Sequence, residues 1–413
     1  MTPPAAAPSA TTISPGPERL ASLDALRGFD MFWILGADAV VSALGRMSQA
    51  APIRILTGQI DHSEWAGFTF YDLIFPLFVF IAGSSLAFSL SRTIEKHGRS
   101  AAAARVVRRA GLLFLLGILY NGGLAGAWPD VRLLGVLQRI AVAYAGAGLL
   151  FCFVPPRVRC ATGVVLLAVY WALLTFVPIR DIALEKHAIA AQLGAPQPTA
   201  LQVRQLFDAT TATVTGGYDA GRNLTNHLDY QWLPGRLYDT YWDPEGMLSM
   251  LPAISTCLLG VMAGCWLRRS DQTPRQKLAH LFVAGAVCLI LGYSWGTEFP
   301  IIKKIWTSSF VLVAGGWSLL LLGTFYYIVD VRQWRGWCQP FVWIGRNPIT
   351  LYLATSLLSF EAIANRLAGG SIAGFFDAHV AHGAGELVLA LVSLGLVVLL
   401  ARFFFSRQIF LRV

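Results

Sequence analysis

Long apolar segments recur along most of the chain, and they constrain its fold more than any other feature. Each runs for about 20 residues, the length that an α-helix needs to cross the hydrocarbon core of a bilayer. Only 13% of the residues are charged, whereas a soluble domain carries roughly 25%. Because lipid requires every backbone polar group to be satisfied internally, the sequence predicts an all-α, polytopic transmembrane helical bundle. We expect about ten spans, at residues 25–45, 67–90, 109–127, 133–154, 160–178, 247–267, 277–295, 307–330, 341–362 and 384–404.

Basic residues gather in alternate loops of this ten-span arrangement. The positive-inside rule assigns such loops to the cytoplasm, so we expect both termini to be cytoplasmic. The formal net charge of +9 then follows from topology, and we expect no nucleic-acid partner. The basic residues are Arg92, Lys96, Arg99, Arg105, Arg108, Arg109, Arg157, Arg159, Arg268, Arg269, Arg275, Lys277, Arg332, Arg335, Arg407 and Arg412.

The domain organisation expected from the sequence is simple. Residues 1–20 are rich in Ala, Pro, Thr and Ser, a composition typical of a disordered tail. Residues 21–413 then form one transmembrane domain, and the segment 179–246 is its longest connection on the outer side. The start of that segment has the pattern of a short interfacial helix.

Ionisable residues lie at the outer mouth of the second span. The loop at 61–65 contains His62 and Glu64, and Asp72 follows about a turn and a half into the span. Asp38 lies near the outer end of the first span. Since ionisable groups in a membrane need compensation, such a group is a functional-site hypothesis by default. We predict His62, Asp72 and Asp38 as catalytic residues.

Other polar residues are expected at the same outer level, where the fourth, sixth and eighth spans begin. Asn347 and Pro348 interrupt the ninth span near its inner end, and a proline there frees a backbone carbonyl that needs a polar partner. We therefore predict a substrate-binding set at these positions. Its members are Gln138, Arg139, Asp243, Glu245, Lys303, Trp306 and Asn347.

Each of these groups also has a structural interpretation. Asp72 and Arg139 could form a buried ion pair between helices, and Lys303 could extend its ammonium to the interface. The segment Asp243-Pro244-Glu245-Gly246 has the residues of a helix N-cap, which we expect it to form. The stretch 377–382 has metal-ligand residue types without a strong third-ligand signature, so we predict a polar loop and no metal.

Several motifs, taken together and in order, resemble a known family. The segment SLDALRG at 22–28 is similar to the opening of the transmembrane acyltransferase superfamily. Five further motifs resemble the heparan-α-glucosaminide N-acetyltransferase family. They are HSEWAG, DLIFPLFVF, GVLQR, DPEG and IWTSS, which begin at residues 62, 72, 135, 243 and 305. An asparagine is expected near the active site of the family, and Asp38 stands there in this chain.

The resemblance implies an acetyl-CoA-dependent N-acetyltransferase embedded in the lipid bilayer. It implies that His62 is the active-site histidine, that cytosolic acetyl-CoA is the donor, that the amine of a glucosamine-type sugar on the outer side is the acceptor, and that the protein is a homodimer. Lysosomal members carry a further lumenal domain and one more span, so we expect a bacterial-type member in the cytoplasmic (inner) membrane.

Two mechanisms remain open for such an enzyme. His62 acts either as a general base in a ternary complex or as a nucleophile that carries the acetyl group. Two other classes also remain open. One is an O-acetyltransferase of a cell-envelope glycan, and the other is a sugar or anion transporter without covalent chemistry.

Overall fold

The computed structural model describes residues 20–410 and confirms the all-α prediction. Within that range, eight helices are long and apolar enough to cross a membrane. The described part of the chain has a single sheet, in which the two-residue strands β1 (Ile179–Arg180) and β2 (Thr213–Val214) pair antiparallel. The predicted tail at 1–20 lies almost wholly outside the described residues.

The longest helix, α4 (Phe70–Tyr120), is a hairpin of two spans. Its backbone leaves the helical region at Gly98, where φ is +81° and ψ is 173°. A Cβ added to Gly148 would lie 2.8 Å from Val106 and 3.3 Å from Leu86. Twenty residues of straight helix extend about 30 Å, so the chain must reverse between Leu86 and Val106. The predicted spans 67–90 and 109–127 are therefore the two arms of α4, and the predicted loop between them is largely helical.

Two predicted spans are interrupted. The first consists of α1 (Ala21–Phe32), the π-turn η1 (Trp33–Ala37) and α2 (Asp38–Met47), with Gly36 at φ +128°. A continuous helix over 341–362 is not found. Instead, α13 (Gln339–Arg346) and α14 (Pro348–Leu357) meet at Asn347, because Pro348 has no N–H to continue the ladder. The chain then enters α15 (Phe360–Ala368).

The remaining long helices match the prediction within a few residues. They are α5 (Val136–Phe153), α6 (Pro156–Phe176), α10 (Met250–Leu267), α11 (Pro274–Trp295), α12 (Ser308–Phe325) with its π-turn η3 (Tyr326–Val331), and α17 (Ala384–Ser406). Glycines let α4 and α10 pack backbone to backbone, since a Cβ on Gly260 would lie 1.9 Å from the Phe80 carbonyl oxygen. The core between α1, α4, α5, α10 and α12 is thereby rigid.

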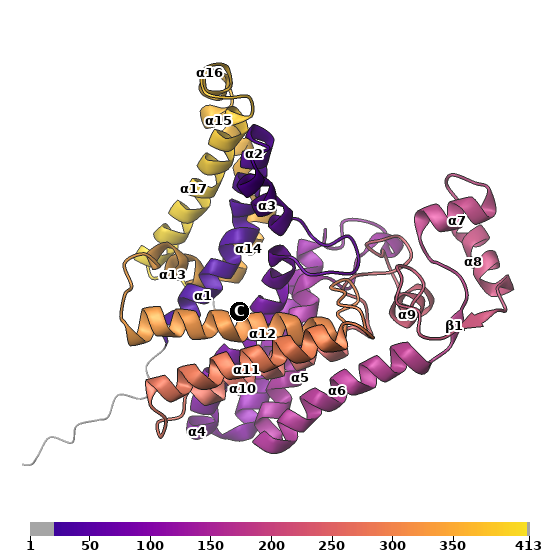
Figure 1. Ribbon diagram of the computed structural model, residues 1–413, viewed down its shortest axis with the longest axis horizontal. Helices are drawn as coiled ribbons and strands as arrows, with labels where there is room; N and C mark the ends of the chain where they lie inside the picture. Colours follow the sequence, from indigo (N-terminus) through magenta and orange to yellow (C-terminus); the bar gives the residue numbers. More distant parts are fainter. Residues whose placement is uncertain (1–19, 411–413) are drawn as a thin grey trace, which may run out of the picture.

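Short helices occupy the connections. They are α3 (Ala51–Ile60), the 3-10 turn η2 (Trp128–Asp130), α7 (Lys186–Leu193), α8 (Ala200–Ala209), α9 (Leu224–Trp232) and α16 (Ser371–His379). Figure 1 shows α7, α8 and α9 together beyond one end of α6, while α15, α16 and α17 rise from another side of the bundle. The segment 179–246 therefore forms a small folded cap rather than an open loop.

Candidate active site

His62 and Asp72 form a close pair at the start of α4. The Nδ1 atom of His62 lies 2.9 Å from Oδ1 of Asp72. The carboxylate is almost fully buried, whereas the His62 side chain is 50% exposed. A carboxylate accepts hydrogen bonds, so the proton of a neutral ring lies on Nδ1 and the lone pair on Nε2. The ring is thereby oriented, and its basic Nε2 lies 3.3 Å from the Lys303 ammonium, which can donate to it.

The second oxygen of Asp72 is held by the loop that precedes α4. Its Oδ2 atom accepts hydrogen bonds from the Ser63 hydroxyl at 2.8 Å and from the Ser63 and Thr69 amides, each at 3.2 Å. Thr69 and Asp72 form a capping box at the helix N-terminus, a motif readable from the spacing of an N-cap threonine and an acidic N3 residue. The position of the carboxylate is thus fixed independently of His62.

Lys303 completes this charged group from a distant part of the chain. Its ammonium lies 3.4 Å from Oδ1 of Asp72 and 3.0 Å from Nδ1 of His62. Burial lowers the pKa of the Lys303 ammonium, while the Asp72 carboxylate acts in the opposite direction. The Gly67 amide donates to the Ile301 carbonyl at 2.9 Å, which joins the two loops. The ammonium is thus held by ionic and polar partners within the site, and its side chain is 19% exposed.

Asp38 approaches His62 only through Tyr71. The Tyr71 hydroxyl donates to Oδ2 of Asp38 at 2.8 Å, and the Tyr71 ring lies 4.8 Å from the His62 ring. Asp38 is therefore placed to position Tyr71. Tyr71 is a site residue that the sequence analysis did not predict. The tyrosine in turn packs against the imidazole.

A second charged group borders the first. Arg132 donates to Oδ1 of Asp243 at 2.8 Å and, through Nε, to Oδ2 of the same carboxylate at 2.9 Å. Its Nη2 also donates to Glu245 at 2.8 Å. The segment 243–246 is a tight turn in which the Gly246 amide donates to the Asp243 carbonyl at 2.8 Å. The predicted N-cap is wrong because α10 begins only at Met250, with no side-chain cap. The Asp243 carboxylate instead caps its own turn, since Oδ1 accepts the Glu245 amide at 3.0 Å.

Arg139 is buried below this turn. Its Nη2 donates to the Pro244 carbonyl at 2.7 Å and to the Ser249 hydroxyl, and its guanidinium lies 4.5 Å from the centre of the Trp306 ring. These partners differ from the Asp72 partner considered in the sequence, so that ion pair is absent from the described residues 20–410. The arginine instead fixes the 243–246 turn against α5.

These groups line a cavity of about 600 Å³, called here the histidine cavity. Its walls combine His62, Asp72 and Lys303 with apolar side chains such as Ile74 and Phe75. A concave, mostly apolar pocket with a few convergent polar groups is the usual form of a small-molecule site. The cavity is also lined by Glu64, Tyr71, Arg132, Arg139, Tyr238, Asp239, Glu245, Lys304 and Trp306.

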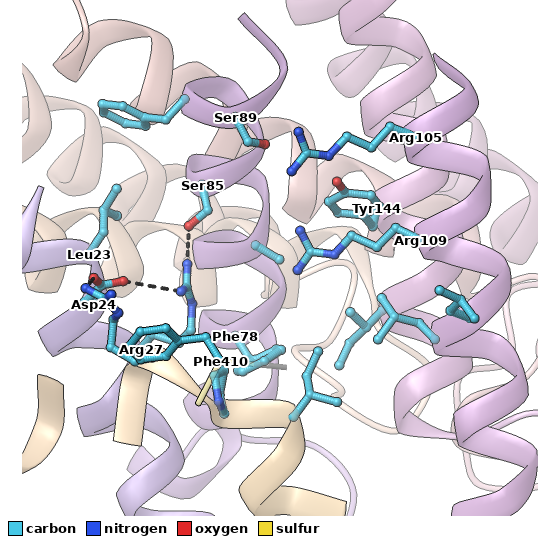
Figure 2. A pocket seen from close by; sticks show the side chains of 18 of the residues that line it. Leu23, Asp24, Arg27, Phe78, Ser85, Ser89, Arg105, Arg109, Tyr144 and Phe410 are labelled. Atoms are coloured by element: carbon cyan, nitrogen blue, oxygen red, sulfur yellow. Dashed lines mark hydrogen bonds and ion pairs between the residues drawn. The ribbon is translucent and has the colours of Figure 1, made fainter. Parts of the chain in front are cut away.

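A second cavity, called here the arginine cavity, has a volume of about 780 Å³. Arg27 on α1 donates to Ser85 and lies 3.5 Å from Asp24. In Figure 2, Arg105 and Arg109 on one arm of α4 face Ser85 and Ser89 on the other arm. Six arginines and one aspartate line the cavity, so its lining has a formal charge of +5. The arginines are Arg27, Arg92, Arg105, Arg108, Arg109 and Arg346.

The two cavities are neighbours that share part of their walls. Both are lined by Phe78, Ile140, Pro348 and Ile349. Along α4, the histidine cavity includes Tyr71 and the arginine cavity extends to Arg92. These 22 residues of helix extend about 30 Å, which matches the thickness of a bilayer core. Together, the cavities follow the first arm of α4 from one end to the other.

The structure brings most, but not all, predicted site residues together. The histidine cavity is lined by His62, Asp72, Arg139, Glu245, Lys303 and Trp306. Gln138 is fully buried beside Gly117 and Gly135 and does not line either cavity. Asn347 donates to the Ile409 carbonyl at 2.9 Å at the break between α13 and α14, and only its neighbour Pro348 reaches the cavities.

The stretch 377–382, predicted as a polar loop, is helical at its start, since Asp377 and His379 belong to α16. Asp377 has a structural role there. Its Oδ1 accepts the Gly383 amide at 3.0 Å and the Gly385 amide at 2.9 Å. His379 stacks on Phe375 with ring centres 4.4 Å apart. These contacts hold the connection between α16 and α17.

The fold and the site together define a multi-pass helical membrane protein with a histidine–carboxylate pair in an internal cavity. The family model described as "Heparan-alpha-glucosaminide N-acetyltransferase, catalytic" matches residues 19–186. This match confirms the resemblance to the family that was seen in the motifs. The matched range contains His62, Asp72, Arg139 and both arms of α4, but not Lys303.

Two named relatives are similar over a larger part of the chain. Heparan-alpha-glucosaminide N-acetyltransferase of Mus musculus is 29% identical over 323 residues, which are 72% of this chain and 49% of the mouse protein. The protein of the same name from Homo sapiens is 28% identical over 321 residues, 71% of this chain and 48% of its own length. The chain thus spans about half the length of these relatives.

Proposed function

We propose that the protein transfers an acetyl group from acetyl-CoA to the amine of a glucosamine-type sugar. The observation that carries this proposal is the His62–Asp72 pair at 2.9 Å, in a cavity that borders an arginine-lined cavity, the two lying along about 30 Å of α4. The named activity of the mouse and human relatives gives the reaction class.

The chemistry proposed for His62 follows from its partners. A sugar ammonium must lose a proton before it can attack a thioester carbonyl, and Nε2 of a ring that donates through Nδ1 can accept that proton. The new amide C–N bond forms as the thioester C–S bond breaks, and the departing thiolate takes up a proton. Alternatively, Nε2 attacks the thioester first and passes the acetyl group to the amine. Lys303 and Arg139 are the cations available to stabilise the oxyanion in either route.

The arginine cavity is the proposed site for the phosphates of acetyl-CoA. Arginine forks bind phosphate oxygens strongly, and the lining has five more cationic than anionic side chains. The pantetheine arm of the donor is long and narrow, so it can extend past Phe78 and Ile140 to bring the thioester to His62. In this proposal the arginine cavity faces the cytosol and the histidine cavity faces outward.

Residues 21–413 act as one catalytic domain in this proposal. The protein is a homodimer in the bacterial cytoplasmic membrane. These statements extend the family relationship and the positive-inside argument.

The test is acetyl transfer by the purified protein in detergent, with labelled acetyl-CoA and glucosamine. Transfer to the amine is expected for the wild type, and His62→Ala is expected to lose at least about 10²-fold in rate while purifying as the same oligomer. Since detergent removes any gradient, labelled N-acetyl product excludes a transporter without covalent chemistry. Product only with a hydroxyl acceptor would favour an O-acetyltransferase, and full activity of His62→Ala would remove the proposed role.

A further inference from the structure

The rim of the histidine cavity contains side chains that the proposed chemistry does not use. Tyr238 and Asp239 lie in the turn that links α9 to the 243–246 segment, and both line the cavity. They are far in sequence from His62, and they lie outside the range matched by the family model. Their arrangement indicates how an acceptor is held.

Tyr238 presents a large aromatic surface to the cavity. The residue is 66% exposed, which is unusual for a tyrosine that lines a pocket. The Arg132 guanidinium lies 4.8 Å from the centre of its ring, and the Tyr238 amide donates to Oδ2 of Asp243 at 3.2 Å. The ring is therefore supported by the Arg132–Asp243 pair, and much of its surface remains open to a ligand.

The turn beside Tyr238 is strained and well defined. The Tyr241 amide donates to the Asp239 carbonyl at 2.9 Å, and the Asp239 amide donates to the Trp242 carbonyl at 3.0 Å. Thr240, at the centre, has φ +72°, the value of the rare form of the γ-turn. A β-branched residue in this region is an outlier, and such strain clusters at ligand-binding positions.

Asp239 supplies a carboxylate beside the aromatic ring. The residue is half-buried, and within residues 20–410 its carboxylate has no hydrogen bond or close ion pair. Lys304, which also lines the cavity, is directed to the Trp65 ring with its ammonium 5.9 Å from the ring centre. Among the described residues the carboxylate has no hydrogen-bonded or close ionic partner, and Lys304 and Lys186 act on it only at longer range, so a ligand cation can bind there.

We infer that Tyr238 and Asp239 form the acceptor subsite, which binds the ring and the ammonium of an amino-sugar pyranose. The C–H face of a pyranose is apolar and suits the open face of the tyrosine, while an ammonium is attracted both to an aromatic face and to a carboxylate. The subsite rests on the proposed function, since it places the amine in the same cavity as His62. It also explains why the Arg132–Asp243–Glu245 group is rigid without taking part in proton transfer.

The test measures binding separately from transfer. Glucosamine binding to the purified full-length protein is followed by saturation-transfer NMR for the wild type, Tyr238→Ala, Tyr238→Phe and Asp239→Asn. Tyr238→Ala and Asp239→Asn are each expected to weaken binding about tenfold, whereas Tyr238→Phe keeps the ring and binds as the wild type does. Trp232→Ala is the matched control, because Trp232 is 70% exposed on the same cap but does not line the cavity.

Kinetics give a second readout. In Tyr238→Ala the KM for the amino sugar rises and the KM for acetyl-CoA does not, whereas a merely structural role would change both. Unchanged glucosamine binding by Tyr238→Ala, or no binding by the wild type, would overturn the subsite. Wild-type binding that depends on Tyr238 without any acetyl transfer would instead overturn the proposed function and leave the subsite intact.

Discussion

The two cavities differ in the balance between positive and negative side chains. In the histidine cavity the central ionic groups are matched, since Asp72 meets His62 and Lys303 while Arg132 meets Asp243 and Glu245. The arginine cavity is lined by six guanidinium groups and one carboxylate, that of Asp24. Matched and hydrogen-bonded charges hold side chains in fixed orientations, which catalysis requires. An excess of one sign attracts a mobile ligand of the other sign.

Among substitutions that test this difference between the cavities, the largest loss of activity is expected at Asp72. Asp72→Asn retains the shape of the side chain but removes the charge that orients the Nδ1 proton of His62, so kcat is expected to fall about 10²-fold or more. Steady-state rates with labelled acetyl-CoA measure this loss. Asp271→Asn removes an exposed carboxylate that is paired with Arg269, and it should leave kcat unchanged. Equal activity of the two variants would contradict a catalytic arrangement at His62.

A smaller effect of a different kind is expected in the arginine cavity. Replacing Arg105 and Arg109 together by Gln removes two of the six cations, so the KM for acetyl-CoA should rise about tenfold or more while kcat changes little. The remaining affinity should also depend less on salt concentration. Arg204→Gln serves as the control, because Arg204 is exposed on α8 and pairs with Asp208 away from both cavities. A loss of kcat without any change in the KM for acetyl-CoA would contradict a role of the arginine cavity in binding acetyl-CoA.

The smallest effect is expected at Tyr71. Tyr71→Phe keeps the ring that packs on His62 but loses the 2.8 Å hydrogen bond to Asp38, so kcat should fall about two- to tenfold. Asp38→Ala should give a similar loss, and the double variant should lose little more, because both act through one hydrogen bond. Additive losses from the two variants, measured by the same assay, would show that Asp38 acts separately from Tyr71.

The long spans were predictable because hydropathy alone identifies segments that can cross a bilayer. The hairpin of α4 was also recoverable from its two apolar arms. Interruptions of helices were harder to predict. The sequence showed a helix break at Asn347 and Pro348, but it did not show that the ninth span would be divided into the separate helices α13 and α14. Helix breaks of this kind depend on packing against other segments, which local sequence does not report.

The site was predictable where its parts are local. Asp72 and His62 lie ten residues apart, and the capping box fixes the Asp72 carboxylate to which His62 is bonded. Lys303 reaches them only through the contact between Gly67 and Ile301, for which no local pattern exists. The spacing of Arg105, Arg108, Arg109 and Leu112 places these residues on one helical face. The sequence thus contained evidence for an arginine-lined surface, but the positive-inside rule already accounted for these arginines.

The contact between the two cavities has a consequence for the membrane itself. Phe78, Ile140 and Ile349 make the shared part of the passage apolar, and a narrow apolar constriction does not conduct ions readily. Under the proposed function, the pantetheine arm of acetyl-CoA would therefore bring its acetyl group past this constriction without opening a path for ions.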